Sequence, residues 1–411
     1  MSNILEMRKE YMLPCLGYFY KEPPVFVSGK MQYLYDNNGK KYLDFFAGVS
    51  VINCGHSNPF ILKRTISQLE KLQHVCNIYL TEPVVELAKK MSQILPGDAA
   101  KKSFFVNSGT EAVEGALLLA RLATEKSRFI ALNGSLHGRT YLTSAVTAIP
   151  MWRTDPFLPS ENIATFLDTS NYEKAVEQLA NILRTSQDFA AFIAEPIQGN
   201  AGIITPPDWF FSQISALLKQ HNVLFIADEM QTGFARTGKM FAIEHYNVVP
   251  DIVAYGKALG NGIPCAGFSA AADIADKFTK PSASTLGGNP VSCATALAVL
   301  EYIETENLLE KAQNLGDLLM RKLANLQKKH GIIKNVRGKG LMLGVELETA
   351  EQVDFVLETA KTEGVILGRN GITRNVIALQ PPLIITTENV ATAIATLDNA
   401  LTAIYAHSSK P

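Results

Sequence analysis

One lysine stands at the end of an apolar run, inside a glycine-rich bend. Lys257 follows residues 252–255, IVAY, and lies within the segment GKALGNG. Lysines are rarely buried without a reason, and a lysine removed from water has a lowered pKa and becomes a nucleophile for aldehydes. The alternative is a surface lysine whose stem packs on apolar atoms while its amine reaches water.

A carboxylate lies 29 residues before this lysine, also after an apolar run. Asp228 directly follows residues 223–227, VLFIA. A buried ionised carboxylate requires a cationic partner, and a protonated pyridine nitrogen would be one. An aspartate that caps the next turn explains the same residue. The separation leaves room for one helix and a return strand, so Asp228 and Lys257 could reach one ring.

A third segment could hold a phosphate. Residues 106–112 read VNSGTEA, which predicts a strand that runs into a helix. Ser108, Gly109 and Thr110 would offer backbone N–H groups and hydroxyls to a phosphate, aided by the helix dipole. An ordinary N-cap turn has the same sequence. Neither G-x-x-x-x-G-K-[ST] nor G-x-G-x-x-G occurs, so a monophosphate fits better than a nucleotide.

These segments must be brought together by the elements around them. From about residue 60 to 300, short apolar runs alternate with segments of helical periodicity. Strands that are apolar on both faces and separated by helices indicate a largely parallel sheet, with ligands at the carboxyl ends of its strands. We expect strands at residues 103–107, 128–132, 190–195, 223–227 and 252–255, and helices at residues 60–73, 83–94, 110–124, 171–186 and 208–220.

The two ends of the chain differ from this middle part. Residues 24–45 alternate apolar and polar residues around an Asn-Asn-Gly turn, which predicts a hairpin. Residues 290–329 predict one long helix or two in tandem, and a βαβ-like tail begins at residues 344–347. The predicted fold class is α/β. A large domain at residues 56–300 has a mostly parallel sheet, and a smaller α+β domain is built from residues 1–55 and 301–411.

The composition is that of an ordinary globular protein. The 411 residues are 47% hydrophobic, enough for a large core, and the formal net charge of −1 suggests no nucleic-acid or membrane-surface partner. No apolar run reaches the roughly 20 residues that span a bilayer, and no secretory signal is visible. The five scattered cysteines predict reduced thiols rather than a disulfide framework or a metal site. We therefore expect a cytoplasmic protein.

Taken together, these segments resemble the class III (ornithine and omega-amino acid) aminotransferases, which have the type I fold of enzymes that depend on pyridoxal 5'-phosphate (PLP). The resemblance covers about residues 12–400, and within that class the chain is most similar to the alanine–glyoxylate aminotransferase 2 group. The segments that carry it are YLDFFAGVSVINCGHSNP, FFVNSGTEAVEGALLLAR, LHGRT, AEPIQGNAGIITPP, IADEMQTGFARTGKMFA, PDIVAYGKALGNGIP, STLGGNPVSCATALAVLE and VRGKGLMLGVEL.

The resemblance implies a role for each matching residue beside the cofactor. Lys257 would form the Schiff base with PLP and move the proton between substrate and cofactor. Asp228 would pair with the pyridine nitrogen, and Gln231 would hydrogen-bond the phenolic oxygen of the ring. Glu195, beside the carboxylate site of the substrate, would act as a gate.

The resemblance also implies that two subunits share the phosphate. Gly109 and Thr110 would bind the phosphate in one subunit. Thr285, in the glycine-rich loop TLGGNP, would reach the phosphate of the neighbouring subunit. An obligate homodimer with active sites at the interface follows from this role.

The chain departs from the family pattern at the cofactor ring. Leu136, in LHGRT, stands where the family usually has an aromatic residue stacked on the ring. A leucine packs on a ring by dispersion but does not stack. His137 either contributes to the ring contact or is a structural hydrogen-bonding residue.

A second departure concerns the substrate. Three residues before a Pro-Pro pair the family commonly has an arginine that binds the substrate α-carboxylate, and here that residue is Ala378. An alanine cannot replace a bidentate guanidinium, so ordinary α-amino acids should be poorer substrates. Arg374 and Arg139 are the candidates for the carboxylate of a 2-oxo acid. Glu195, without its usual partner, could meet the amine end of a diamine or of a simple cationic amine.

Three aromatic residues precede the hairpin. Tyr18, Phe19 and Tyr20 match the region where the N-terminus of the family lines the substrate pocket. They form an aromatic wall for an apolar amine, or they pack the N-terminal segment on the protein.

The predicted function is ping-pong transfer of an amino group from an omega-amine or amino acid donor to a 2-oxo acid such as pyruvate or glyoxylate. Two alternatives stay open. The same fold and motifs serve amino acid racemases, aminomutases and a decarboxylase. The chain could also be a non-catalytic binding protein derived from an aminotransferase, although the joint presence of Asp228, Gln231 and Lys257 argues against it.

Overall fold

A computed structural model describes residues 2–98 and 100–408. The strands of these residues form three sheets. The largest sheet has seven strands in the order β4-β10-β9-β8-β7-β5-β6. Their bounds are β4 (Lys101–Val106), β5 (Arg128–Leu132), β6 (Ala164–Leu167), β7 (Phe189–Ala194), β8 (Leu224–Asp228), β9 (Ile252–Tyr255) and β10 (Ala266–Ala271).

This sheet is parallel apart from one strand. The pairs β5–β6, β5–β7, β7–β8 and β8–β9 are parallel, whereas β10 is antiparallel to both β4 and β9. The expected mostly parallel sheet is confirmed, and its five expected strands match β4, β5, β7, β8 and β9 within two residues at each end. The sequence pattern does not predict β6, which is short and half-exposed, or β10, whose small residues AGFSAA give a weak apolar signal.

Helices pack against this sheet. α5 lies against β9 and β10, α4 against β4, and α9 against β8. The five helices expected between residues 60 and 220 correspond to α3, α4, α5, α8 and α9. The helices of this part are α3 (Pro59–Lys71), α4 (Glu82–Ile94), α5 (Gly109–Thr124), α6 (Tyr141–Ala145), α7 (Ser160–Ile163), α8 (Tyr172–Thr185), α9 (Phe210–Gln220), α10 (Ala272–Ala275) and α11 (Pro290–Thr305), with short 3-10 turns η1 (Pro150–Trp152), η2 (Ala242–Tyr246) and η3 (Lys257–Gly260).

Two four-stranded sheets are built from the ends of the chain. One has the order β1-β2-β3-β13 and the other β11-β12-β15-β14. The predicted hairpin is the β2–β3 pair, whose turn contains Gly39 at a φ of 78°. These strands are β1 (Phe26–Lys30), β2 (Tyr33–Asp36), β3 (Lys41–Asp44), β11 (Asn335–Lys339), β12 (Met342–Glu346), β13 (Val365–Ile366), β14 (Gly368–Asn370) and β15 (Val376–Leu379), and the helices are α1 (Ser2–Tyr11), α2 (Ala47–Ser50), α12 (Leu308–Lys329), α13 (Ala350–Thr362) and α14 (Thr387–Ser408).

The C-terminal part of the chain differs in detail from the expected long helix and βαβ-like tail. Residues 290–329 form two helices in tandem, because Asn307 adopts a left-handed conformation between α11 and α12. The strand that follows α13 does not return to the sheet of β12. Instead β13 pairs in parallel with β3 from the N-terminal segment. The two ends of the chain are therefore joined in one sheet.

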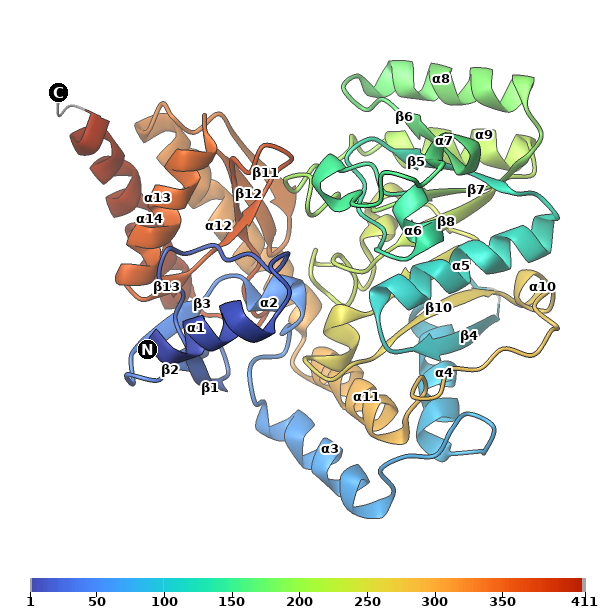
Figure 1. Cartoon of the computed structure of the whole chain (residues 1–411), viewed down its shortest axis with the longest axis horizontal. Coiled ribbons are helices and arrows are strands. Elements are labelled where there is room, and N and C mark those ends of the chain that lie inside the picture. Colours follow the sequence, from blue (N-terminus) through green and yellow to red (C-terminus); the bar gives the residue numbers. More distant parts are fainter. Residues whose placement is uncertain (1, 99, 409–411) are drawn as a thin grey trace.

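Figure 1 shows these end segments together on the left and the seven-stranded sheet on the right, with α3 and α11 below. We propose that the smaller domain comprises residues 1–55 and 301–411 and the large domain residues 56–300, because the shared sheet joins both ends. No helix in the described part of the chain is long and apolar enough to cross a membrane.

Candidate active site

The carboxyl ends of neighbouring strands bring the predicted residues together. β8 ends at Asp228, which pairs with Ala254 of β9, and Lys257 follows three residues later. Glu195 comes directly after β7, and residues 133–138 come directly after β5. Because the carboxyl ends of parallel strands meet at one edge of a sheet, these side chains can face a single ligand.

Lys257 has a strained backbone conformation, and burial makes its amine reactive. It opens η3 with a φ of 45°, in the left-handed region that costs a residue with a side chain about 1–2 kcal/mol. Burial lowers the pKa of its amine to about 8, and the negative charges of Asp228 and Glu195 oppose that shift. An amine with this pKa is partly neutral near physiological pH and can attack an aldehyde.

Asp228 is oriented by two hydrogen bonds. Its Oδ2 lies 2.7 Å from Nδ1 of His137, and its Oδ1 accepts from the backbone N–H of Met230 at 3.1 Å. The His137 side chain is fully buried, and within the described residues its Nε2 has no hydrogen-bond partner. The structure therefore gives His137 the hydrogen-bonding role, with Asp228 as its partner.

Glu195 is fixed beside this pair by the backbone. One carboxylate oxygen accepts from the N–H of Leu136 and the other from the N–H of Gly199, both at 3.0 Å. Burial raises the pKa of Glu195 to about 7, and the nearby charge of His137 opposes the shift. A moving gate would have to break both backbone bonds, so the gate role of Glu195 stays a prediction that these contacts do not favour.

Gln231 lies in the middle of a chain of three amides. Its Nε2 donates to Asn200 Oδ1 at 2.9 Å, and its Oε1 accepts from Gln380 Nε2 at 3.2 Å. A Cβ added to Gly199 would lie 2.4 Å from Gln231 Oε1, so the glycine leaves the amide its space. Sequence reasoning missed Asn200 and Gln380. A signal for Gln380 exists, since it stands two residues after Ala378, directly after β15 and before the Pro-Pro pair.

The N-terminus of α5 is the turn at which the sequence predicts a phosphate site. Ser108 caps the helix: its hydroxyl accepts from the N–H of Glu111, whose carboxylate accepts in return from the N–H of Ser108. The first N–H groups of a helix, here those of Gly109 and Thr110, have no partner inside the helix. A Cβ at Gly109 would lie 2.8 Å from the sulfur of Met230. Both the N-cap and the anion-binding interpretation are therefore compatible with this turn.

The segment after β3 contains a left-handed turn. Ala47, Gly48, Val49 and Ser50 have φ between 50° and 68°, although only one of them is glycine. The Asp44 carboxylate accepts from the N–H of Phe46 and the N–H of Ala47, both at 2.8 Å, and its second oxygen contacts His56 at 2.7 Å. This aspartate compensates part of the strain of the turn.

Ala378 lies in a row of small residues that crosses β12, β15 and β14. It is fully buried in β15 and pairs with Gly344 on one side and Gly368 on the other. A Cβ at Gly368 would lie 2.1 Å from the ring of Phe46, and a Cβ at Gly344 would lie 3.1 Å from Ile203. The space beside Ala378 is thus filled by neighbouring apolar side chains.

The other predicted residues lie outside this cluster or at its edge. Tyr18 packs under the guanidinium of Arg8 at 4.5 Å, and Tyr20 donates from its hydroxyl to the carbonyl of Leu367 at 3.3 Å. Phe19 contacts the Phe46 ring, with 5.6 Å between centroids. Arg374 is exposed on a turn, near Glu351, and Arg139 and Thr285 are exposed.

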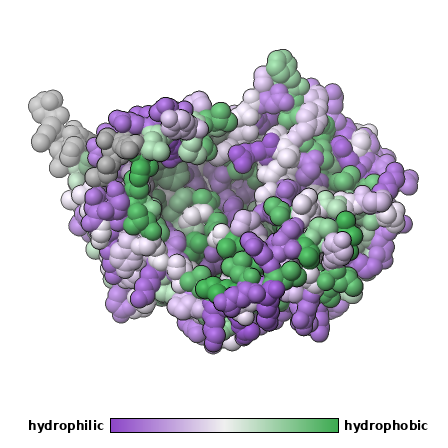
Figure 2. All heavy atoms as spheres, turned by 60° about the horizontal axis from the view of Figure 1, so that its bottom comes forward, coloured by the Kyte–Doolittle hydropathy of each residue, from purple (hydrophilic) through white to green (hydrophobic). Residues whose placement is uncertain are grey.

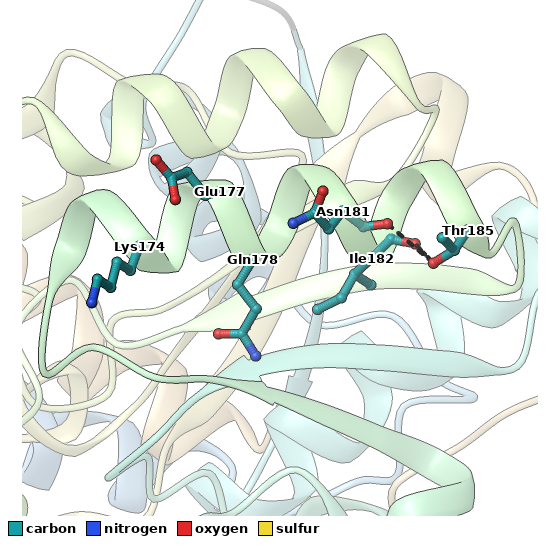
Figure 3. A pocket seen from close by; sticks show the side chains of 6 residues that line it. All are labelled: Lys174, Glu177, Gln178, Asn181, Ile182 and Thr185. Carbon is teal, nitrogen blue, oxygen red and sulfur yellow. Dashed lines mark hydrogen bonds between the residues drawn. The ribbon is translucent and has the colours of Figure 1, made fainter.

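A surface hollow lies away from this cluster. A shallow hollow runs along the outside of α8, lined by residues of that helix alone, from Lys174 to Thr185 (Figure 3), and it contains no predicted site residue. Across residues 2–98 and 100–408, no group of three or more His, Cys, Asp or Glu side chains could hold a metal ion.

Comparison with known proteins agrees with the geometry. The family model for "Aminotransferase class-III" matches residues 20–401. The chain is 39% identical to alanine–glyoxylate aminotransferase 2 homolog 2, mitochondrial, of Arabidopsis thaliana, covering 97% of this chain and 87% of the relative. It is 39% identical to the acetylornithine aminotransferase of Methanosarcina acetivorans, covering 97% and 96%. It is 36% identical to 5-aminovalerate aminotransferase DavT of Pseudomonas aeruginosa, covering 89% and 90%.

Solved structures show the same arrangement. The ornithine aminotransferase of Toxoplasma gondii superimposes with a TM-score of 0.90 at 29% identity, covering 99% of this chain and 96% of that one. An S-selective transaminase from Arthrobacter sp. with alanine bound gives a TM-score of 0.91 at 28% identity, covering all of both chains.

Fold and site together define a PLP-dependent transferase. The chain belongs to the class III aminotransferase family. The residues present fit the cofactor of this family. Lys257 offers a buried amine of lowered pKa that can react with the aldehyde of PLP. Asp228 offers an oriented carboxylate that can pair with the protonated pyridine nitrogen. Gly109 and Gly256 leave free space next to Met230 that a Cβ would fill.

Proposed function

We propose that this aminotransferase prefers donors that lack an α-carboxylate next to the reacting amine, and that it passes the amino group to a small 2-oxo acid such as pyruvate or glyoxylate. The observation that carries the proposal is Ala378. It is buried between Gly344 and Gly368, and the Phe46 ring lies against Gly368, so this position offers no guanidinium to a carboxylate. The amides of Asn200 and Gln380, which contact Gln231, are both neutral.

Each residue of the site then has a defined task. PLP, when bound, supplies an electron sink for the substrate carbon. Lys257 holds the cofactor and afterwards, as a free amine, moves the proton at the substrate carbon. Asp228, oriented by His137, keeps the pyridine nitrogen protonated. Gln231 donates to the phenolic oxygen, Leu136 packs on the ring, and the N-terminus of α5 binds the phosphate.

The carboxylate of the acceptor needs a cation, and we propose Arg139. Arg374 lies near Glu351 on the outside of the protein. Arg139 follows Gly138, where an added Cβ would lie 3.1 Å from the methyl group of Thr110 at the N-terminus of α5. Arg139→Ala should raise the KM for pyruvate at least about tenfold, since a charge-assisted hydrogen bond contributes about 1.5–3 kcal/mol. Arg374→Ala is the matched control and should leave that KM unchanged. The reverse result would assign the carboxylate to Arg374.

We also propose a homodimer in which Thr285 reaches the phosphate of the neighbouring subunit. Thr285 is exposed and makes no side-chain hydrogen bond within the described part of its own chain. Its loop lies beside the end of β4, where Asn107 donates to the Ser284 hydroxyl at 3.3 Å. A cytoplasmic location is part of the same proposal, supported by five cysteines that are all free.

A donor screen tests the substrate proposal. The purified protein should show visible absorption with PLP that disappears on borohydride reduction. β-Alanine, 4-aminobutyrate, putrescine, 1-phenylethylamine and a set of α-amino acids are then offered with pyruvate, and alanine is measured. Better use of an α-amino acid other than alanine than of every amine would overturn the proposal. Reaction of an amino acid without any acceptor would instead indicate a racemase.

A further inference from the structure

Gln231 has both ends of its side-chain amide engaged by other amides. Asn200 accepts from its Nε2 at 2.9 Å, and Gln380 donates to its Oε1 at 3.2 Å. A primary amide has two N–H donors, so one N–H of Gln231 is left for a ligand. The two neighbours therefore decide which atom of Gln231, the nitrogen or the oxygen, faces the site.

Gln380 is well placed to impose this orientation. Its side chain is fully buried, its own N–H donates to the carbonyl of Phe45 at 2.8 Å, and the next carbonyl, that of Pro381, accepts from the guanidinium of Arg236 at 2.6 Å. Its backbone is thus fixed on both sides. Its Oε1 is buried and has no hydrogen-bond partner in the described part of the chain. Buried amide oxygens usually have a hydrogen-bond partner. Because the oxygen of Gln380 has none, the hydrogen bond from its Nε2 to Gln231 is the contact that explains a polar residue here.

The backbone of Gly199 restricts how the Gln231 amide can move if its hydrogen bond to Gln380 is lost. Gly199 lies against its amide so closely that an added Cβ would sit 2.4–2.6 Å from all three terminal atoms. The backbone of Gly199 thus limits movement of the amide toward it, whereas the amide can still rotate about its last bond. Exchange of nitrogen and oxygen is therefore the motion that Gln380 prevents.

We propose that Gln380 is a positioning residue that fixes the amide of Gln231 with its nitrogen toward the phenolic oxygen of the cofactor. This inference rests on the proposed function, which places Gln231 at that oxygen. A donated N–H favours the deprotonated phenolic oxygen, whereas a carbonyl presented there favours the protonated one. Gln380 thus tunes the protonation of the bound cofactor without touching it.

The test is the pH titration of the visible absorption band of the protein loaded with PLP. Gln380→Met removes the donor and keeps the length of the side chain. The pH midpoint of the band should rise by about half a unit to one unit, because a single hydrogen bond contributes that much. The dissociation constant for PLP, measured by titrating the PLP-free protein, should rise about 2- to 10-fold.

Two further variants separate positioning from a loss of packing. Leu379→Met, at the neighbouring residue whose side chain points to the opposite face, should leave the midpoint unchanged. Gln380→Glu keeps the shape of the side chain and offers only acceptors when ionised, so it should raise the midpoint even if Gln380→Met folds poorly. An unchanged midpoint in both Gln380 variants would overturn the inference.

A double-mutant cycle tests whether Gln380 acts through Gln231. Gln231→Met should shift the midpoint in the same direction, and adding Gln380→Met to that variant should cause no further shift. Additive shifts would mean that Gln380 acts independently, against the inference. A wild-type protein that shows no visible band with PLP would overturn the proposed function as well, whereas a normal wild-type band with unshifted variants would overturn the inference alone.

Discussion

The amine of Lys257 is held partly neutral by its surroundings. Burial lowers its pKa to about 8 from an ordinary value of 10.5, although Asp228 and Glu195 favour the charged form. Those two carboxylates keep the shift moderate, so the amine can be both a nucleophile and, once protonated, an acid. A lysine that serves one reaction in both directions requires such a balance.

The pKa of Lys257 gives a pH dependence for attachment of the cofactor. The neutral amine is the reactive form, and its fraction rises about tenfold per pH unit below the pKa and levels off above it. The rate at which PLP-free protein develops the visible band should therefore rise with pH and become constant above about 8. Rapid-mixing absorption measurements from pH 6 to pH 10 would show the profile. A rate that still rises at the upper limit would mean that the amine is an ordinary lysine.

Ala378→Arg tests the basis of the substrate proposal at the same scale. A guanidinium at this position should improve kcat/KM for α-amino acids by about tenfold or more, since a charge-assisted pair contributes about 1.5–3 kcal/mol. Phe46 occupies the adjacent space, so the arginine should also lower the free energy of unfolding. Combining it with Phe46→Ala should restore stability. No gain in α-amino acid use in a folded double variant would show that Ala378 does not face the substrate.

The sequence predicts those site residues whose neighbours along the chain show that they lie at the end of a strand. Lys257 and Asp228 each follow an apolar run, and the runs prove to be adjacent strands. Asn200 and Gln380 escape prediction because the contact that matters joins residues far apart in the chain. His137 was predictable in part. The sequence indicates it as a site residue, but only the fold shows that it contacts the Asp228 carboxylate.

At the scale of elements, the left-handed turn of α2 is the least expected part of the fold. The apolar and polar pattern around residues 46–52 contains no sign of four consecutive residues at positive φ. The turn exists because Asp44, at the end of β3, binds two of its backbone N–H groups. It places Phe46 against Gly368, which pairs with Ala378 of β15.

Two substitutions with opposite effects test this account of the turn. Asp44→Ala should destabilise the protein by about 1–3 kcal/mol, because it leaves buried N–H groups without a partner. Val49→Gly should stabilise it, or leave it unchanged, because a left-handed residue with a side chain costs about 1–2 kcal/mol and glycine recovers much of that. Urea unfolding of the PLP-free protein measures both. Destabilisation by Val49→Gly would show that its side chain contributes more packing than strain.

At the scale of the whole molecule, one face carries an unusual number of exposed apolar side chains. They come from the outer side of α3 and from the segment that follows it: Leu62, Ile66, Leu69, Leu72, Ile78, Tyr79 and Leu80. Figure 2 brings this face forward and shows green patches on it, next to the recess between the two halves of the molecule. Contiguous apolar patches of this kind mark surfaces that other proteins cover, and the proposed homodimer would cover this one.

Leu80→Asp tests that surface as the dimer interface. Its side chain is 93% exposed in the single chain, so the substitution should not unfold the subunit but should place a charge in the proposed interface. Light scattering should show a shift from dimer to monomer, with weaker PLP binding because Thr285 of the partner is lost. Val249→Asp, at another exposed apolar residue, is the control and should stay dimeric. A dimeric Leu80→Asp protein would locate the interface elsewhere.

The sheet that joins β3 to β13 has a consequence for how the protein is made. β3 ends at Asp44 and β13 begins at Val365, so the N-terminal hairpin leaves the ribosome long before its partner strand exists. At about 5–20 residues per second, the wait is on the order of 20 to 60 seconds. During that time the edge of β3 is open to other chains. Slow synthesis or a shortened C-terminus should therefore leave this hairpin exposed to chaperones and proteases.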